Sequence, residues 1–523
     1  FTEIQSGRAT TALTAGGATG RGSAPVPEGQ PVPTRYLVFI DNLFSLEKHR
    51  NDVLDALEED VDALGPDDWM AIVEFDGRRL ERLIGWENRH EPLREALREA
   101  RSRPSSGLHR LAEIREVDDW RNLERAHIEF LEQRLTAGAR GAGPNNDDNA
   151  QDSGDGLLRA IDNLKNMTLE KAGAYEVDYA TMVRSQIRAA SLGAAAAMRG
   201  FSQARGRKAL LLLAGGWPSS ALEYAISDGT QTTSLLLDAS MKRMGVERDD
   251  PLFPMVDAAN LIGYTIYPID VPGFQRADTI REGATDDTMF STDEKEPAEM
   301  NELQRERELF HHDSLEFVAF DTGGEALINA QRLHALPTVR LDTRDYYWLG
   351  FSRDREDDDA RHEIEIRVER PGVDVRARTG FVDMSRGTEA DLEVEAALRF
   401  DNLIDTGPLD LTLGEPLDPR KKRLEVPLDI RIPLDEVTMV PTNGFYYGDI
   451  EIRISVMDEK GNTASSDVRS VSVEGAEPPP PGAHYTYSTT LEIRNRNHKI
   501  VVGVHDTTSG ASLSGSTRLS PAG

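Results

Sequence analysis

The chain has 523 residues, with 60 basic and 91 acidic side chains, a formal net charge of −31 and no cysteine. This length allows about two to four domains. The negative charge argues against nucleic acid and anionic lipid as partners. The absence of cysteine excludes disulfides, thiolate metal sites and cysteine nucleophiles. No run of about 20 apolar residues occurs, so the sequence predicts no transmembrane segment.

The N-terminal segment, residues 1–34, is rich in Gly, Ala, Thr and Pro and poor in large apolar side chains. We expect an extended segment that lies on the surface or crosses to another domain. The chain begins at Phe1 rather than Met. We therefore expect an N-terminus that is either processed or incomplete. A removed leader is consistent with an exported protein, located in the periplasm, at the cell surface or outside the cell.

The stretch RYLVFIDNLFS, residues 35–45, is typical of the first strand of an open α/β sheet, which would place Asp41 at the ligand-binding edge. Ser45 is a candidate N-cap for the helix that follows. Further strands are predicted at 69–75, 80–86, 208–213 and 264–271, and further helices at 91–101, 255–262 and 314–320, the last closed by Gly323-Gly324.

Two long connections interrupt this α/β pattern. Residues 104–185 contain amphipathic helical stretches on either side of a polar tip at 141–156. We expect a helical insertion that is either a solvated scaffold extension or a partner-binding arm. Residues 273–312 are acidic and poorly patterned, and they predict a loop. The α/β domain as a whole is predicted over 35–344.

From Tyr346 onward the apolar residues alternate with period two, which is typical of half-buried strands. This predicts an antiparallel β meander over 345–386 and an Ig-like β-sandwich over 387–523. Pro427 lies on the face opposite to the apolar one and predicts an edge strand. The Pro478 to Pro481 run predicts a stiff loop.

Seven motifs occur in an order that resembles one family: RYLVFIDNLFS, WMAIVEFDG, GRKALLLLAGG, GYTIYPIDVPG, SLEFVAFDTGGEAL, DYYWLGFS and RVERPGVDVRARTGF. This set, over residues 35–383, resembles the von Willebrand factor A (VWFA)-related proteins of the acidobacterial type. The resemblance implies a doubly wound, Rossmann-like VWFA sheet, export, and a β-rich C-terminal extension. The opening FTEIQSGR resembles the end of a β-domain that precedes such domains.

The resemblance also implies a place for a metal-ion-dependent adhesion site (MIDAS). Such a site takes an Asp and two hydroxyls from D-x-S-x-S, a Thr from a second loop and an Asp from a third, around Mg²⁺. Here Asp41 and Ser45 match, but Leu43 replaces the first serine. The third loop has Ala214-Gly215-Gly216 without a carboxylate, and Thr181 is the only candidate for the second. The sequence therefore predicts a degenerate MIDAS and no bound cofactor, with Mg²⁺ as the alternative.

Two other roles are open to this sheet edge. Asp41 and Ser45 can cap the following helix. The same edge can also bind a protein without metal, with Trp217 as a hot spot if it is exposed. The candidate partner-binding residues are Asp41, Asn42, Phe44, Ser45, Gly215, Gly216 and Trp217.

The remaining candidate chemistry is weak. His311-His312-Asp313 predicts a surface pair, since adjacent helical residues point to different faces. We find no nucleophile elbow, phosphate loop or zinc motif, and the sequence predicts no enzyme.

Three functional hypotheses follow. The first is an exported, metal-independent protein-interaction or scaffold protein. The second is a cation-dependent adhesion module that uses Asp41 and Ser45. The third is a structural subunit of an extracellular or envelope assembly. All three hypotheses require protein partners. In the third, these partners belong to a larger assembly.

Overall fold

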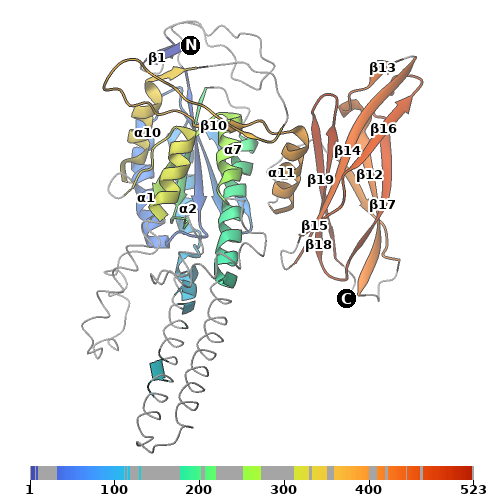
Figure 1. The fold of residues 1–523 in the computed structure, drawn as a ribbon, viewed down its shortest axis with the longest axis horizontal. Coiled ribbons are helices and arrows are strands. Elements are labelled where there is room, and N and C mark those ends of the chain that lie inside the picture. The colour runs from blue at the N-terminus through green and yellow to red at the C-terminus, as the bar shows by residue number, and fades with distance from the viewer. Residues whose placement is uncertain are drawn as a thin grey trace, which may run out of the picture.

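The computed structural model describes residues 2–5, 8–9, 32–110, 177–201, 206–218, 251–271, 311–328, 333–349, 358–399, 409–417, 422–442, 444–459 and 463–520, with isolated residues between 112 and 133. These residues form an α/β part with a mainly parallel sheet and a part made of antiparallel sheets (Figure 1). The middle of the predicted helical insertion, most of the predicted acidic loop and most of the N-terminal segment lie outside the described residues. No helix within the described ranges is long and apolar enough to cross a membrane.

The α/β part is built on a five-stranded sheet in the order β5-β4-β3-β6-β7. Its strands are β3 (Thr34–Asp41), β4 (Trp69–Phe75), β5 (Leu80–Glu87), β6 (Arg207–Ala214) and β7 (Tyr264–Asp270). All neighbours are parallel except β5, which pairs antiparallel with β4. The predicted strands are confirmed at these positions, because apolar runs of this kind form strands when both faces of the sheet are covered.

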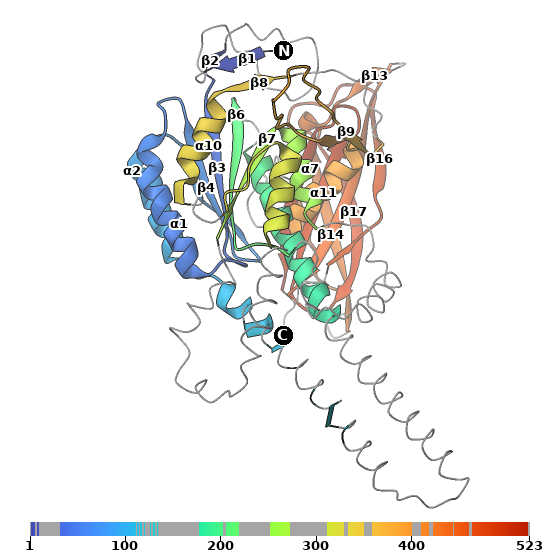
Figure 2. The same cartoon turned by 60° about the vertical axis from the view of Figure 1, so that its left-hand side comes forward.

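Helices cover both faces of this sheet (Figure 2). One face carries α1 (Glu47–Asp60), α2 (His90–Ser102) and α10 (Ala335–Arg344), and a short 3₁₀ turn, η1 (Val61–Ala63), follows α1. The other face carries α7 (Phe253–Ile262) and the helical residues 177–200 and 311–322. Alternate residues of β3 therefore belong to two separate cores: Leu37 and Phe39 to one, Val38 and Ile40 to the other.

Short strands follow the α/β part, and here the predicted meander is only partly correct. β8 (Tyr346–Trp348) pairs with the N-terminal β1 (Thr2–Gln5), which also pairs with β2 (Arg8–Ala9). β9 (Arg361–Glu363) pairs with β10 (Gly380–Val382). The alternating stretch between β9 and β10 is not a strand: Val368, Val373 and Val375 are 43–49% exposed, so its apolar face has no core to pack against.

A helix that the sequence did not predict, α11 (Arg386–Arg399), lies between the α/β part and the antiparallel sheets (Figures 1 and 2). Leu392 packs against the α/β core, whereas Val394 and Leu398 pack against Val501 of the β part. The hydroxyl of Ser385 accepts a hydrogen bond from the Thr388 amide at 3.2 Å, as an N-cap does.

The β part, residues 409–520, contains two antiparallel sheets that share one apolar core. One sheet is β11 (Asp410–Leu413), β12 (Arg423–Pro433) and β17 (His484–Arg494). The other is β13 (Val440–Thr442), β14 (Phe445–Asp458), β15 (Thr463–Ser465), β16 (Arg469–Gly475), β18 (His498–Asp506) and β19 (Ser512–Leu519). A 3₁₀ turn, η4 (Leu434–Glu436), follows β12.

The prediction that Pro427 marks an edge strand is wrong, because β12 is the middle strand of its sheet. The Pro427 carbonyl accepts the Gly414 amide at 2.8 Å. The missing N–H therefore faces Gly414, just past the end of β11, and not β17, the other neighbour of β12.

Candidate functional site

The sheet edge predicted as a binding site is centred on Asp41, the last residue of β3, which is fully buried. Its Oδ1 accepts hydrogen bonds from the Leu43 amide at 2.9 Å and the Phe44 amide at 3.4 Å. Its Oδ2 accepts the indole Nε1–H of Trp217 at 2.7 Å. Both carboxylate oxygens are therefore used inside the protein, which is how a buried carboxylate is stabilised.

Burial raises the pKa of Asp41 to about 6, and the hydrogen bonds from Trp217, Leu43 and Phe44 oppose that rise. The desolvation of the charged form outweighs the three donors. The pKa of Asp41 therefore lies well above that of a free aspartate even though its carboxylate is well hydrogen-bonded.

The predicted capping of α1 is wrong in its details. Residue Leu46, not Ser45, is the N-cap of α1, and no side chain caps that helix. Asp41 instead closes the turn at residues 41–44, where it bonds the amides two and three residues on. Ser45 is fully buried, and its Oγ has no hydrogen-bond partner among the residues that the structure describes.

Two glycines bring backbone against this turn. A Cβ on Gly215 would lie 2.1 Å from the Phe44 carbonyl oxygen, and a Cβ on Gly107 would lie 2.4 Å from that of Ser45. Gly216 has a φ of +89° and packs against the ring of His311. The Gly215-Gly216 pair therefore serves close packing, and it turns the chain so that Trp217 reaches Asp41.

The seven predicted partner-binding residues, Asp41, Asn42, Phe44, Ser45, Gly215, Gly216 and Trp217, are all buried. Partner contact through them stays a prediction, and their burial argues against it, because a buried side chain offers no surface to a partner. The sequence analysis tied the hot spot to an exposed Trp217, whereas this side chain is 0% exposed.

The residues present do not fit the Mg²⁺ site that the resemblance implies. Trp217 donates to the Asp41 oxygen that an ion would need, and Ala214-Gly215-Gly216 supply no carboxylate. Thr181 is exposed on the helical residues 177–200, whereas Asp41 and Ser45 are fully buried.

The sequence analysis missed Arg50, a buried residue of α1 that holds the neighbouring Asn42 in place. Arg50 donates to the Asn42 side chain at 2.7 Å and to the carbonyls of Arg101 and Arg103 at 3.3 and 2.8 Å. These carbonyls are at the end of α2, so Arg50 ties two helices to the turn. No sequence signal indicates this role, because the two carbonyl acceptors lie 51 and 53 residues away.

The prediction of a surface histidine pair at His311-His312 is wrong for His311, which is 4% exposed. Burial lowers its pKa to about 4, against the opposing effects of Asp270 and of hydrogen bonds with the backbone of Gly215 and Gly216. His312 lies 3.5 Å from the carboxylate of Asp270 at the end of β7. Both histidines are therefore structural parts of the sheet edge.

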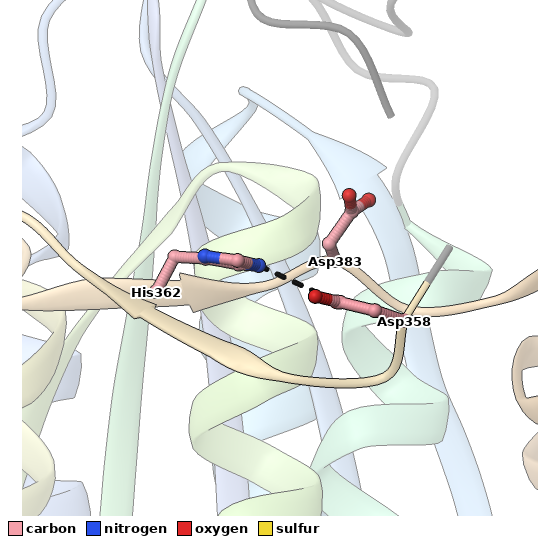
Figure 3. Close-up of side chains that lie close together, drawn as sticks. All are labelled: Asp358, His362 and Asp383. Atoms are coloured by element: carbon pink, nitrogen blue, oxygen red, sulfur yellow. Dashed lines mark hydrogen bonds and ion pairs between the residues drawn. The ribbon is translucent and has the colours of Figure 1, made fainter. Parts of the chain in front are cut away.

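A second candidate site is formed by Asp358, His362 and Asp383, whose ligand atoms all lie within 4.8 Å of one another (Figure 3). Asp358 precedes β9, His362 lies in β9, and Asp383 follows β10. The His362 ring stacks on Phe381, its cross-strand partner, with ring centroids 5.2 Å apart. None of these three residues was predicted as a site from the sequence.

Comparisons with known proteins leave the family of the chain open. No family model and no curated protein matches it. Three solved structures each cover 22% of the chain: a structural-genomics target at 20% identity, the putative ApaA protein from Bordetella pertussis at 15%, and the sporulation control protein Spo0M from Bacillus subtilis at 11%. The matches span 86%, 96% and 49% of those chains, with TM-scores of 0.13–0.14, which are too low to support an argument.

Proposed function

We propose that this protein is an exported, non-enzymatic protein-interaction or scaffold protein, built on a VWFA-like domain and an Ig-like β-sandwich, and independent of metal at the sheet edge. The supporting observation is the 2.7 Å hydrogen bond from Trp217 to Asp41. A neutral donor from within the chain satisfies the carboxylate oxygen that a MIDAS cation would otherwise coordinate.

The scaffold role is supported by how α11 connects the two parts. Arg453 of β14 bonds Asp391 of α11 at 2.6 Å, and Arg188 of the α/β part lies 4.0 Å from Glu395 of the same helix. Together with the apolar contacts of α11 on both sides, these contacts hold the α/β part and the β part at a fixed spacing.

Because the residues of the sheet edge are buried, we place the partner-binding surface elsewhere, on the insertion over about 104–185. Replacing residues 118–176 by a short Gly/Ser linker should abolish capture of partner proteins from secreted fractions of the source organism. Capture of the same proteins by the shortened chain would contradict this assignment.

The cation-dependent alternative is tested at Ser45, because the two hypotheses give this hydroxyl opposite roles. In our proposal Ser45→Ala removes a buried hydroxyl that lacks a partner in the described structure, so the variant should be as stable as the wild type or slightly more stable. In an adhesion site Ser45 is a ligand, and its loss would abolish stabilisation by Mg²⁺.

The measurement is thermal unfolding of both chains in EDTA and across a Mg²⁺ titration. We expect no Mg²⁺-dependent shift in either chain. An ion at a hundredfold excess over its dissociation constant would add about 2.7 kcal/mol. A shift of that order in the wild type that is lost in Ser45→Ala would overturn the proposal and favour the adhesion module.

A further inference from the structure

The Asp358, His362 and Asp383 side chains combine the donor types that borderline divalent metals prefer. The group offers one imidazole nitrogen and two carboxylate oxygens within 4.8 Å of one another. Imidazole favours Zn²⁺ and its neighbours over Mg²⁺ or Ca²⁺, and carboxylates complete many zinc sites. A purely acidic cluster would not show this selectivity.

The spacing of the donor atoms also matches such a site. His362 Nε2 lies 3.4 Å from Asp358 Oδ1, which is long for a hydrogen bond. Metal–ligand bonds of about 2.0–2.1 Å in a tetrahedron place two ligand atoms about 3.3–3.4 Å apart. The ligand atom of Asp383 lies within 4.8 Å of those of Asp358 and His362, which is at most about 1.4 Å more than the separation in a tetrahedral site. Small side-chain rotations would therefore bring all three donors onto one ion.

The backbone fixes the positions of these three residues. The Asp383 amide donates to the Ala360 carbonyl, and the Asp359 amide donates to the Asp383 carbonyl, each at 3.1 Å. Asp358 Oδ1 also accepts the Ala360 amide at 3.0 Å. Asp383 is only 6% exposed, whereas the side chains of Asp358 and His362 are 33% and 25% exposed. The group thus has a buried ligand on one side and an opening to solvent on the other.

We propose that Asp358, His362 and Asp383 bind one divalent ion of the zinc type, with the fourth position left for water or for a ligand from a partner. The site is separate from the sheet edge and does not depend on the proposed function. Its neighbour Asp359 accepts hydrogen bonds from Ser385 and Thr388 at the start of α11. A bound ion would therefore brace the connection from the α/β part to α11.

The test is a calorimetric titration of the full chain with Zn²⁺, after removal of metal by chelator and in a large excess of Mg²⁺. The Mg²⁺ occupies weak carboxylate sites, which a chain of net charge −31 is expected to have. We expect one Zn²⁺ per chain, with affinity lowered more than about 10-fold in His362→Gln and in Asp383→Asn, since loss of a supporting group alone costs that much. Asp358→Asn changes a more exposed ligand, and it provides the test if Asp383→Asn does not fold.

The matched control is His90→Gln. His90 is also a partly exposed histidine bonded to an aspartate, Asp62, at 2.8 Å, but it belongs to no such three-ligand group in the described structure. This variant should bind Zn²⁺ like the wild type. Co²⁺ should give the strong visible absorption of a four-coordinate ion in both chains and lose it in His362→Gln. Absence of one-to-one binding, or equal affinity in His362→Gln and the wild type, would overturn the proposal.

Discussion

The sheet edge around Asp41 and the group around His362 both contain carboxylates of the kind that bind metal ions, but the surroundings of those carboxylates differ. Asp41 is fully buried, and its oxygens accept donors from Trp217 and the turn amides. The His362 group lies partly in solvent, with three ligand atoms within 4.8 Å of one another. A residue that matches a motif can therefore have a structural role, while a group of potential metal ligands can form where no sequence motif is apparent.

The largest change in the free energy of unfolding is expected from substitution of the buried Asp41. Asp41→Ala removes the acceptor of the Trp217 indole and of the Leu43 amide. Each buried donor left unsatisfied costs about 1–3 kcal/mol, so the free energy of unfolding should fall by about 2–6 kcal/mol. Urea unfolding at neutral pH measures this change. Trp217→Phe, which leaves an Asp41 oxygen without its donor, should also lower the free energy of unfolding. Wild-type stability of Asp41→Ala would contradict the structural role.

The stability of the protein should also depend on pH through two buried groups at the sheet edge, Asp41 and His311. The pKa of Asp41 is raised from 3.8 to about 6, so its contribution to stability falls as pH rises between these values. The pKa of His311 is lowered from 6.5 to about 4, so its contribution rises with pH over about the same range. The two contributions oppose each other in the wild type.

Asp41→Asn removes only the first contribution. The stability of this variant relative to the wild type should therefore increase by about 2 kcal/mol from pH 4 to pH 6, which is most of the roughly 3 kcal/mol that the whole pKa shift corresponds to. Urea unfolding of both chains at pH 4, 5, 6 and 7 measures this difference. A constant difference across that range would show that Asp41 does not titrate there.

A smaller effect is expected from the glycine that packs against the turn. In Gly215→Ala the new Cβ meets the Phe44 carbonyl, and overpacking of this kind costs about 1–3 kcal/mol. The control is Gly85→Ala in β5, where a Cβ meets nothing within 4 Å. That variant should match the wild type or gain up to about 1 kcal/mol, since glycine is unfavourable in a strand. Equal stability of the two variants in thermal unfolding would contradict the close packing at Gly215.

The smallest effect is expected at the partly exposed group. His362→Gln in EDTA should change the free energy of unfolding by about 0.5 kcal/mol or less, as surface substitutions usually do. Urea unfolding at neutral pH measures this change, as for Asp41→Ala. A loss as large as that of Asp41→Ala would remove the distinction between the two sites.

The sequence predicted the parts of the fold that depend on local pattern. The strands at β3, β4, β6 and β7 are continuous apolar runs, and the helix that ends at Gly323 has a recognisable C-terminal glycine. In contrast, α11 was missed because alternating apolar residues before and after it favoured strands. The Asp41–Trp217 bond joins residues 176 positions apart, and no local pattern encodes it.

The candidate sites, too, were predictable only where they depend on local sequence pattern. Asp41 was located at the correct sheet edge, because the end of a buried strand is visible in the sequence. The burial of Asp41 could not be predicted, because the backbone packed against its turn comes from Gly107 and Gly215, which are distant in the sequence. The His362 group was missed because Asp383 reaches it only through the pairing of β9 with β10.

The central claim is that the indole of Trp217 takes the place of a cation at Asp41. The most direct measurement is the hydrogen exchange and chemical shift of the Trp217 indole N–H in EDTA and with Mg²⁺, assigned by comparison with Trp217→Phe. The account predicts slow exchange and one unchanged signal in both conditions, because the bond is buried and internal. Rapid exchange in EDTA together with a shifted signal on adding Mg²⁺ would contradict it.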